Sequence, residues 1–455
     1  MIPIVTPEEM RAVDAAAPEP VDELIDRAGR ATARVALDML GGSYGRVVNV
    51  LAGGGNNGSD GRTAGTYLQR RGVKVRVIDA AMRPPKLPPC DLVIDAAYGT
   101  GFRGEWIAPE IVSPRGERPL VLAVDIPSGV NASTGEAGPG VLAADRTVTF
   151  QALKPGLVFG AGRELCGLID VVDIGLDVSE ASQHLVGPTD VAAWWPTRST
   201  DAHKWNGAVR VVAGSPGMLG AGRLCAEAAA RAGAGLVTLS SPGLDPDARS
   251  EIIQRRIAST EFHAEVFADL DRFRSLVIGP GLGREEGIIA SARALIGDAT
   301  LPVVIDGDGI FAAAWSADGA GPLLRPRGRP TVITPHDGEF SLLAGRAPGI
   351  DRVGAARALA ADLDVVVLLK GPTTVVATPA GQVLVVDHGD ERLATAGSGD
   401  VLAGMIGALL AAGVAPERAA AGAAWLHADA AVRGPRRGLL AGDIVDLIPS
   451  ALEAL

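Results

Sequence analysis

Residues 46–60 read Arg-Val-Val-Asn-Val-Leu-Ala-Gly-Gly-Gly-Asn-Asn-Gly-Ser-Asp, an apolar run followed by a glycine-rich turn. The apolar run at 46–51 predicts a buried strand, and residues 60–71 after the turn have helical character. Further short apolar runs follow at 73–77, 92–94 and 120–124. Short apolar strands between helices favour a parallel sheet with both faces covered. We expect helices from residues 6–40 to pack on this sheet.

A second block of strands, turns and helices begins after residue 200. An Ala-rich helix is predicted at 221–232, and strands are predicted at 209–214, 236–239, 275–278, 303–305, 331–333 and 365–369. The intervening region, about 177–200, contains Pro188 and Trp194-Trp195-Pro196 and is interpreted as a linker. The sequence therefore predicts two α/β domains, residues 1–195 with the linker from about 177, and residues 200–455.

Composition narrows the classes of function. The chain has 455 residues, of which 47% are hydrophobic and 21% charged, so each half can bury a core of its own. The formal net charge of -11 argues against a nucleic-acid binder, which would present a basic face. It does not argue against a small anionic ligand, because one glycine-rich helix N-terminus can hold a phosphate.

The cysteines and the apolar segments suggest a cytoplasmic protein. Cys90, Cys166 and Cys225 are far apart and odd in number, so neither a disulfide framework nor a thiolate metal site is expected. Residues 1–9 lack a basic region followed by an apolar core, so no secretory signal is expected. The longest uncharged apolar run, 401–415, is too short to span a bilayer and predicts a buried helix.

The turn at residues 53–61 lies where a strand ends and a helix begins. Glycines at such a place let backbone amides approach a phosphate, and the helix dipole favours an anion. The turn is neither a GxGxxG motif nor a Walker loop, and no Gly-Lys-Ser/Thr occurs in the chain. A tight turn with an Asp that caps the helix is the simpler alternative.

Three more turns carry polar side chains after apolar strands, at residues 95–104, 124–129 and 153–157. In an open parallel sheet, loops at the carboxyl ends of strands converge on one crevice. Asn57, Asp95, Asp125 and Ser128 are therefore expected to meet, and their oxygen atoms suit a hard cation or a polar ligand. Each Asp taken singly could also cap a helix or brace a turn.

Residues 55–61, 95–101, 124–129 and 154–156 together resemble the NAD(P)H-hydrate epimerases, over most of residues 1–175. That family interconverts the R and S forms of hydrated NAD(P)H, and the resemblance implies a Rossmann-like three-layer αβα domain. The resemblance also implies a potassium ion held by Asn57, Asp95 and Ser128, with Asp125 as the acid/base. Ligand contacts are implied for Asn56, Asn57, Gly58, Ser59, Asp60, Gly99, Thr100, Gly101, Phe102, Arg103, Gly104, Glu105 and Asp125. The chain departs from the family at Ser59, usually Gly, and at Ile25-Asp26-Arg27, usually Met-Glu-Asn.

In the second half, Ala394-Thr-Ala-Gly-Ser-Gly-Asp400 precedes a long apolar run. Glycines at the mouth of a helix form an anion hole, and an Asp on its first turn can take a proton from a hydroxyl group. A capped buried helix is the simpler alternative. Polar or glycine-rich turns after predicted strands, at 279–283, 305–309, 334–340 and 369–374, accompany this motif.

This set resembles the ADP/ATP-dependent NAD(P)H-hydrate dehydratases, which have a ribokinase-like α/β fold, from about residue 203 to 443. The resemblance implies that Ala234, Gly281, His336 and Asp400 contact the hydrate, and that Asp400 is the catalytic base. It implies that ADP is held by Lys370, Gly371, Pro372, Thr373, Thr374 and Gly399. Magnesium is expected with ADP, whose phosphate activates the ring hydroxyl before its elimination. Asp337 stands where the family usually has Pro.

We predict a bifunctional repair enzyme that epimerises R and S NAD(P)HX and dehydrates the S form to NAD(P)H at the expense of ADP. Its partners would be NADHX or NADPHX, ADP and further copies of the chain, without nucleic acid or membrane. One alternative is a ribokinase-type kinase of a vitamin or small alcohol with a fused binding domain. Another is that the first half binds nucleotides without catalysis.

Overall fold

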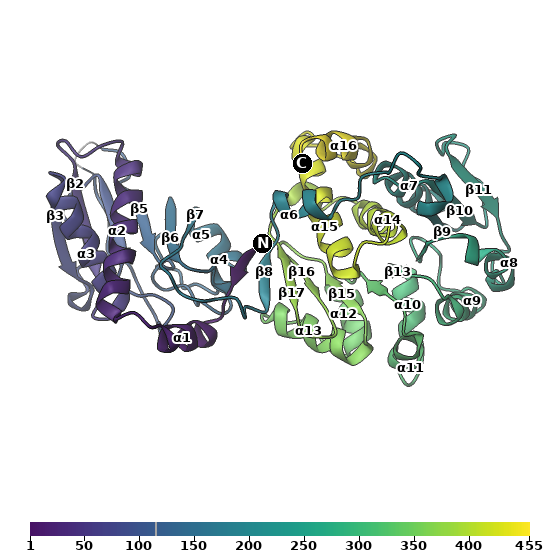
Figure 1. Cartoon of the computed structure of the whole chain (residues 1–455), viewed down its shortest axis with the longest axis horizontal. Helices are drawn as coiled ribbons and strands as arrows, with labels where there is room; N and C mark the ends of the chain where they lie inside the picture. The colour runs from purple at the N-terminus through teal and green to yellow at the C-terminus, as the bar shows by residue number, and fades with distance from the viewer. Residues whose placement is uncertain (114–115) are drawn as a thin grey trace. The chain divides into compact units, whose positions relative to one another are not determined.

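The computed structural model describes residues 1–113 and 116–455 and divides into two compact units. The first unit is Ile2–Gln183, and the second is His184–Leu455 together with Met1 (Figure 1). The region interpreted as a linker contains strand β8 (Gln183–Leu185) and helix α6 (Pro188–Trp194). Among the described residues, no helix is long and apolar enough to cross a membrane.

The first unit is built on a parallel sheet with the strand order β3-β2-β4-β5-β6-β7. Its strands are β2 (Val47–Ala52), β3 (Lys74–Asp79), β4 (Leu92–Ala96), β5 (Leu120–Val124), β6 (Arg146–Phe150) and β7 (Leu168–Val172). The short strand β1 (Ile2–Ile4) leads to Val5, whose N–H donates to the carbonyl of Leu153. The predicted parallel sheet is therefore present.

Alternating side chains direct the two faces of this sheet to different layers. Val48, Val50 and Ala52 of β2 pack with helices α2 and α3, whereas Leu51 packs with Trp106 and other residues of the loops on the opposite face. One layer is thus helical and the other is formed mainly by irregular segments. The helices of this unit are α1 (Pro7–Ala16), α2 (Val21–Leu40), α3 (Asn56–Arg70), α4 (Pro155–Val158), α5 (Gly162–Leu165) and the 3-10 helix η1 (Ala80–Met82).

The second unit contains a larger sheet with the strand order β8-β17-β16-β15-β14-β13-β12-β9-β10-β11. Strands β9 to β15 run parallel to one another. Strands β16 and β17 form a hairpin, and β16 pairs with β15 in the antiparallel direction. The bounds are β9 (Ala208–Val212), β10 (Leu236–Ser241), β11 (Ile252–Arg256), β12 (Ser275–Ile278), β13 (Val303–Ile305), β14 (Thr331–Ile333), β15 (Val366–Leu369), β16 (Thr374–Ala377) and β17 (Val383–Val386).

Helices cover both faces of this sheet (Figure 1). One face packs on α6, α7 (Leu219–Arg231), α14 (Ser398–Ala411), α15 (Pro416–Arg433) and α16 (Ala441–Glu453). The remaining helices are α8 (His263–Phe267), α9 (Glu286–Asp298), α10 (Asp308–Ala314), α11 (Gly321–Leu324), α12 (Asp337–Ala344) and α13 (Arg352–Leu363). The 3-10 helices are η2 (Lys204–Gly207), η3 (Leu270–Arg272), η4 (Arg325–Arg327) and η5 (Glu391–Leu393).

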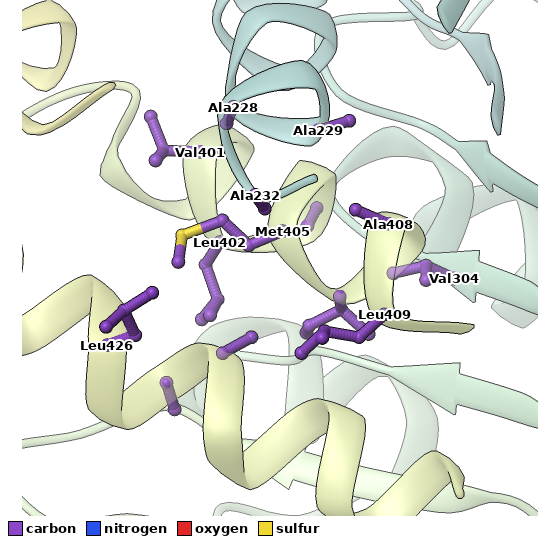
Figure 2. Packing of buried hydrophobic residues seen from close by; sticks show 14 of the residues in the cluster. Ala228, Ala229, Ala232, Val304, Val401, Leu402, Met405, Ala408, Leu409 and Leu426 are labelled. Atoms are coloured by element: carbon purple, nitrogen blue, oxygen red, sulfur yellow. The ribbon is translucent and has the colours of Figure 1, made fainter. Parts of the chain in front are cut away.

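Helix α14 lies in the middle of the core, and all of its residues from Val401 to Ala411 are buried. Figure 2 shows Leu402, Met405 and Leu409 of α14 between α7 and α15. A Cβ atom at Gly404 would lie 2.0 Å from the carbonyl oxygen of Cys225, so only glycine allows α7 to approach this closely. This packing fixes the position of the first turn of α14, which carries Asp400.

Candidate active sites

The glycine-rich turn of the first unit connects β2 to α3 and packs closely against the residue that follows β4. A Cβ atom at Gly53 would lie 2.0 Å from the carbonyl oxygen of Ala97, and one at Gly58 would lie 1.9 Å from that of Gly53. Glycine is therefore required at both positions. The turn presents the N-terminus of a 15-residue helix to the carboxyl edge of the sheet, a suitable place for an anion.

Asp95 and Ser128 meet at the same edge, below this helix end. The Ser128 hydroxyl group donates to Asp95 Oδ1 at 2.6 Å, and the Ser128 N–H donates to Asp95 Oδ2 at 2.9 Å. Burial raises the pKa of Asp95. Both polar atoms of the Asn57 side chain are buried without a hydrogen-bond partner. An amide oxygen, a carboxyl group and a hydroxyl group are oxygen donors of the kind that a hard cation prefers.

Asp125 follows β5 in a conformation that residues other than glycine seldom adopt, with a φ of 67°. Its Oδ1 lies 2.7 Å from Lys154 Nζ, and its Oδ2 accepts from the Thr100 N–H at 3.3 Å. The Lys154 side chain is only 2% exposed and also donates to Thr149 Oγ1. Backbone strain combined with a buried ion pair is characteristic of functional sites. Lys154 was quoted in the sequence motif but was not among the predicted site residues.

Two more carboxyl groups act on this region. Asp60, which follows the first turn of α3, has a pKa raised to about 8, chiefly because burial desolvates its carboxylate, with smaller contributions from Asp125 and Asp14. Burial also raises the pKa of Asp14 on α1, and Lys154 opposes that shift. Asp125 therefore contacts the buried ammonium group, and Asp60 and Asp14 interact with it electrostatically. The contribution of α1 was not predicted from the sequence.

Not every predicted epimerase residue is tied into this cluster. A Cβ atom at Gly99 would lie 3.1 Å from Asp125 Oδ2 and 3.3 Å from Asn57 Cβ, so Gly99 adjoins both. Arg103 and Glu105 are exposed, and Arg103 donates to the carbonyl of Phe102. Asp26, in the divergent part of α2, accepts from the Tyr67 hydroxyl group and so links α2 to α3.

In the second unit, the loops after β13, β14 and β15 meet around one lysine. Lys370 Nζ lies 2.9 Å from Asp306 Oδ1 and 3.8 Å from Glu339 Oε2. The Thr334 hydroxyl group donates to the same Asp306 oxygen at 2.6 Å. Asp308 accepts from the Gly283 N–H and from Arg284. The carboxyl edge of the sheet therefore carries a polar cluster around Lys370, with Asp308 held separately by the loop after β12.

Asp400 joins this network from the first turn of α14. A Cβ atom at neighbouring Gly399 would lie 3.4 Å from Lys370 Nζ, which places the turn against the lysine. Burial raises the pKa of Asp400 to about 7, and the charge of Asp306 adds to the shift while Lys370 opposes it. A carboxyl group with a pKa near neutrality is suited to accept a proton in catalysis.

His336 caps helix α12 at the same edge. Its Nδ1 accepts from the N–H groups of Gly338 and Glu339, so the proton of the neutral ring is on Nε2. The side chain is 61% exposed, and its Nε2 lies 3.6 Å from Glu339 Oε1 on the side open to solvent and ligand. Asp337, the departure from the family pattern, pairs with Arg352, which also donates to the carbonyl of Lys370. Asp337 thereby braces the loop that carries Lys370.

The structure does not bring Ala234 to this site. Ala234 lies between the end of α7 and the start of β10, at the amino end of a parallel strand, whereas Gly281, His336 and Lys370 follow the carboxyl ends of theirs. Six residues of strand, roughly 20 Å, separate the two edges. A cavity of about 700 Å³ near Gly233 lies at the amino edge, away from the clustered carboxylates.

The first turn of α7 does reach the site. A Cβ atom at Gly281 would lie 2.9 Å from Ala221 Cβ and 3.1 Å from Met218 Cβ, so these residues line the loop after β12. Sequence reasoning missed both, although Gly-Ala-Gly before an apolar helix resembles the other glycine-rich turns. It also missed His427 of α15, a fully buried histidine whose pKa burial lowers to about 4, which bonds to the backbone of Ser398.

Comparisons with known proteins agree with the two-unit architecture. Residues 209–449 match the family described as NAD(P)H-hydrate dehydratase, and residues 21–88 and 78–156 match the YjeF-related protein N-terminus. A ribokinase-like superfamily protein from Enterococcus faecalis has a TM-score of 0.51 and 22% identity, covering 61% of this chain and 98% of that chain, and supports the fold alone.

Curated relatives match along most of the chain. A bifunctional NAD(P)H-hydrate repair enzyme from Mycobacterium tuberculosis is 39% identical over 84% of this chain and 82% of the relative. One from Moorella thermoacetica is 34% identical over 99% of this chain and 97% of the relative. One from Escherichia coli K12 is 32% identical over 93% and 88%.

Proposed function

Because the chain belongs to the family of bifunctional NAD(P)H-hydrate repair enzymes, we propose that its two clusters of carboxyl groups carry the two activities. The first unit epimerises R and S NAD(P)HX, and the second dehydrates the S form. One observation supports this division most strongly. Each unit places a carboxyl group of raised pKa near the carboxyl edge of its own parallel sheet, Asp60 just after the first turn of α3 and Asp400 on the first turn of α14.

In the dehydratase site, Asp400 is the base that takes the proton of the ring hydroxyl group. Its pKa near 7 leaves a large fraction of the carboxylate ready to accept a proton at neutral pH. His336 donates from Nε2 to the hydrate, and Gly281 leaves room for the ring beside Ala221. The open N–H groups of the first turn of α14 stabilise developing phosphate charge.

The nucleotide would be ADP, held by residues 370–374 and Gly399. Lys370 supplies a compact positive charge at the strand end, and the hairpin of β15 and β16 supplies the turn. Asp306 and Asp308 would hold the magnesium that accompanies ADP, because they offer oxygen donors, although they do not form a complete cage among the described residues. Magnesium usually reaches such sites with phosphate oxygens and water completing its shell.

In the epimerase site, potassium would be held by Asn57, Asp95 and Ser128. The unpaired side-chain amide of Asn57 supports this choice, because buried amide groups normally have partners. When bound, the cation would supply positive charge near the anionic ligand. Asp125 would act on the substrate as the acid/base, held in place by Lys154 and Thr149.

A direct test supplies the purified full chain with S-NADHX, magnesium and either ADP or ATP, and follows absorbance at 340 nm. Recovery of NADH with ADP is expected, and the Asp400→Asn variant should abolish it. The same protein given pure R-NADHX without nucleotide should produce the S epimer. Failure of both reactions, with phosphorylation of a thiazole or pyrimidine alcohol instead, would identify a kinase and contradict the proposal.

A separate test addresses potassium. Replacing potassium by lithium should slow epimerisation and leave dehydration of S-NADHX unchanged. The Asn57→Ala variant should lose this cation dependence, because it removes an oxygen ligand. An epimerisation rate that is equal in both salts would remove potassium from the proposed site.

A further inference from the structure

Asp60 is a buried carboxyl group without a counter-ion in contact with it. The residue is 8% exposed, and its carboxyl group has no hydrogen-bond partner among residues 1–113 and 116–455. Asp125, by contrast, lies 2.7 Å from the ammonium group of Lys154. The two acids of the epimerase site therefore differ in their contacts, because Asp125 contacts a cation and Asp60 does not.

Geometry places Asp60 beside Asp125. Asn57 and Asp60 are three residues apart on α3, so they share one face of that helix. Gly99 lies between Asn57 and Asp125, because a Cβ atom on it would be within 3.3 Å of Asn57 Cβ and 3.1 Å of Asp125 Oδ2. Asp60 therefore lies on the face of α3 that also carries Asn57, near enough to Asp125 for the two carboxyl groups to interact electrostatically.

The two carboxyl groups have different charged neighbours. Asp125 contacts the Lys154 ammonium group, and Asp60 has no such cation in contact. Asp125 and Asp14 of α1 act electrostatically against ionisation of Asp60, Lys154 acts in the opposite direction, and α2 presents Gly29 to the backbone of Asp60. Burial and the two negative neighbours raise the pKa of Asp60 to about 8, so it is protonated at pH 7. A protonated carboxyl group close to a second carboxyl group that contacts a cation is an arrangement suited to a general acid and a general base.

We propose that Asp60 is a second catalytic residue of the epimerase, the acid that works with Asp125 as the base. This inference rests on the proposed epimerase function. Water added next to the ring nitrogen leaves a hydroxyl group and the nitrogen on one carbon. Asp125 takes the hydroxyl proton, the oxygen forms a carbonyl, the carbon–nitrogen bond breaks, and its electron pair takes the proton of Asp60.

The ring then closes from the other face by the reverse transfers. The nitrogen pair attacks the carbonyl carbon, its proton returns to the Asp60 carboxylate, and the carbonyl oxygen takes the proton back from Asp125. Both acids regain their starting states, and no oxidant, reductant or co-substrate is consumed. The cycle therefore runs without nucleotide, which separates it experimentally from dehydration.

The test follows conversion of pure R-NADHX to the S epimer by the full chain without nucleotide, by chromatography between pH 5 and 10. The wild-type kcat should fall above about pH 8 as Asp60 loses its proton.

The variants test the role of Asp60 directly. Asp60→Asn should lower kcat by roughly 10²–10⁴-fold, change KM by less than about threefold, and abolish the alkaline fall in kcat. Asp60→Glu should restore part of the rate. Asp14→Asn should move the alkaline fall to lower pH, because it removes an acidic neighbour of Asp60. Asp22→Asn, which changes an exposed acid of α2, is the matched control and should leave both the rate and the alkaline fall unchanged.

Several results would overturn the role of Asp60. These are a raised KM with unchanged kcat in Asp60→Asn, an equal loss in the Asn and Glu variants, or an alkaline fall that persists in Asp60→Asn. Retained cooperative unfolding of the first unit and retained dehydration of S-NADHX with ADP show that a variant is folded. A wild-type chain that cannot interconvert the epimers would instead refute the proposed function itself.

Discussion

Two opposing effects set the pKa of the Asp400 carboxyl group. Burial and acidic neighbours raise this pKa, and the Lys370 ammonium group lowers it. Because a base must be ionised to accept a proton, dehydration should rise with pH through about 7 and then level off. Lys370→Gln removes the positive charge that lowers this pKa, so the rise should move to higher pH while the KM for ADP increases. Initial rates across pH 5–9 measure both effects, and an unshifted profile in Lys370→Gln would contradict the assigned coupling.

The same pKa has a consequence for stability. An Asp whose pKa is raised on folding binds a proton in the native state over a pH range in which the unfolded chain has lost it, so stability falls between about pH 4 and 7. Asp400→Asn removes this penalty. We expect its thermal midpoint to exceed that of the wild type at pH 8, by a few degrees, and the difference to shrink towards pH 4. A lower midpoint at pH 8 would contradict the cause assigned to the shift.

At the scale of elements, the crossing of α7 and α14 positions the catalytic turn. Gly404→Ala would place a Cβ atom 2.0 Å from the Cys225 carbonyl oxygen, so the helices must separate. Overpacking of this kind costs about 1–3 kcal/mol of unfolding free energy, and displacement of Asp400 should lower dehydration at the same time. Gly442→Ala on α16 is the matched control, because its Cβ meets no atom within 4 Å. Denaturant unfolding that shows equal stability for the two variants would contradict this account.

At the scale of the whole molecule, each unit has its own sheet, core and proposed site. Asp125→Asn should therefore abolish epimerisation and leave dehydration of S-NADHX within about twofold, and Asp400→Asn should do the reverse. Neither variant should repair R-NADHX completely, but an equimolar mixture of the two should. Loss of both activities from one substitution would show that the sites are not independent.

Local patterns in the sequence were sufficient for much of the architecture. Apolar runs with glycine turns predicted β2, β12, β13, β14 and the helix that begins at Gly397-Ser398-Gly399-Asp400, because strand, turn and helix signals lie within a few neighbouring residues. The antiparallel hairpin of β16 and β17 was not predicted, since two four-residue apolar runs do not specify a direction. The predicted sites themselves remain proposals for the experiments above.

The sequence alone determined the two α/β domains, the glycine-rich turns after several strands, and the carboxyl groups that those turns carry. Only the tertiary structure decided which turns share an edge, and so placed Ala221 rather than Ala234 beside Gly281. It also decided that Asp60 and Asp400 have raised pKa values. The physical reason is that strand order, burial and the distances between charges depend on elements far apart in the chain, which no local pattern records.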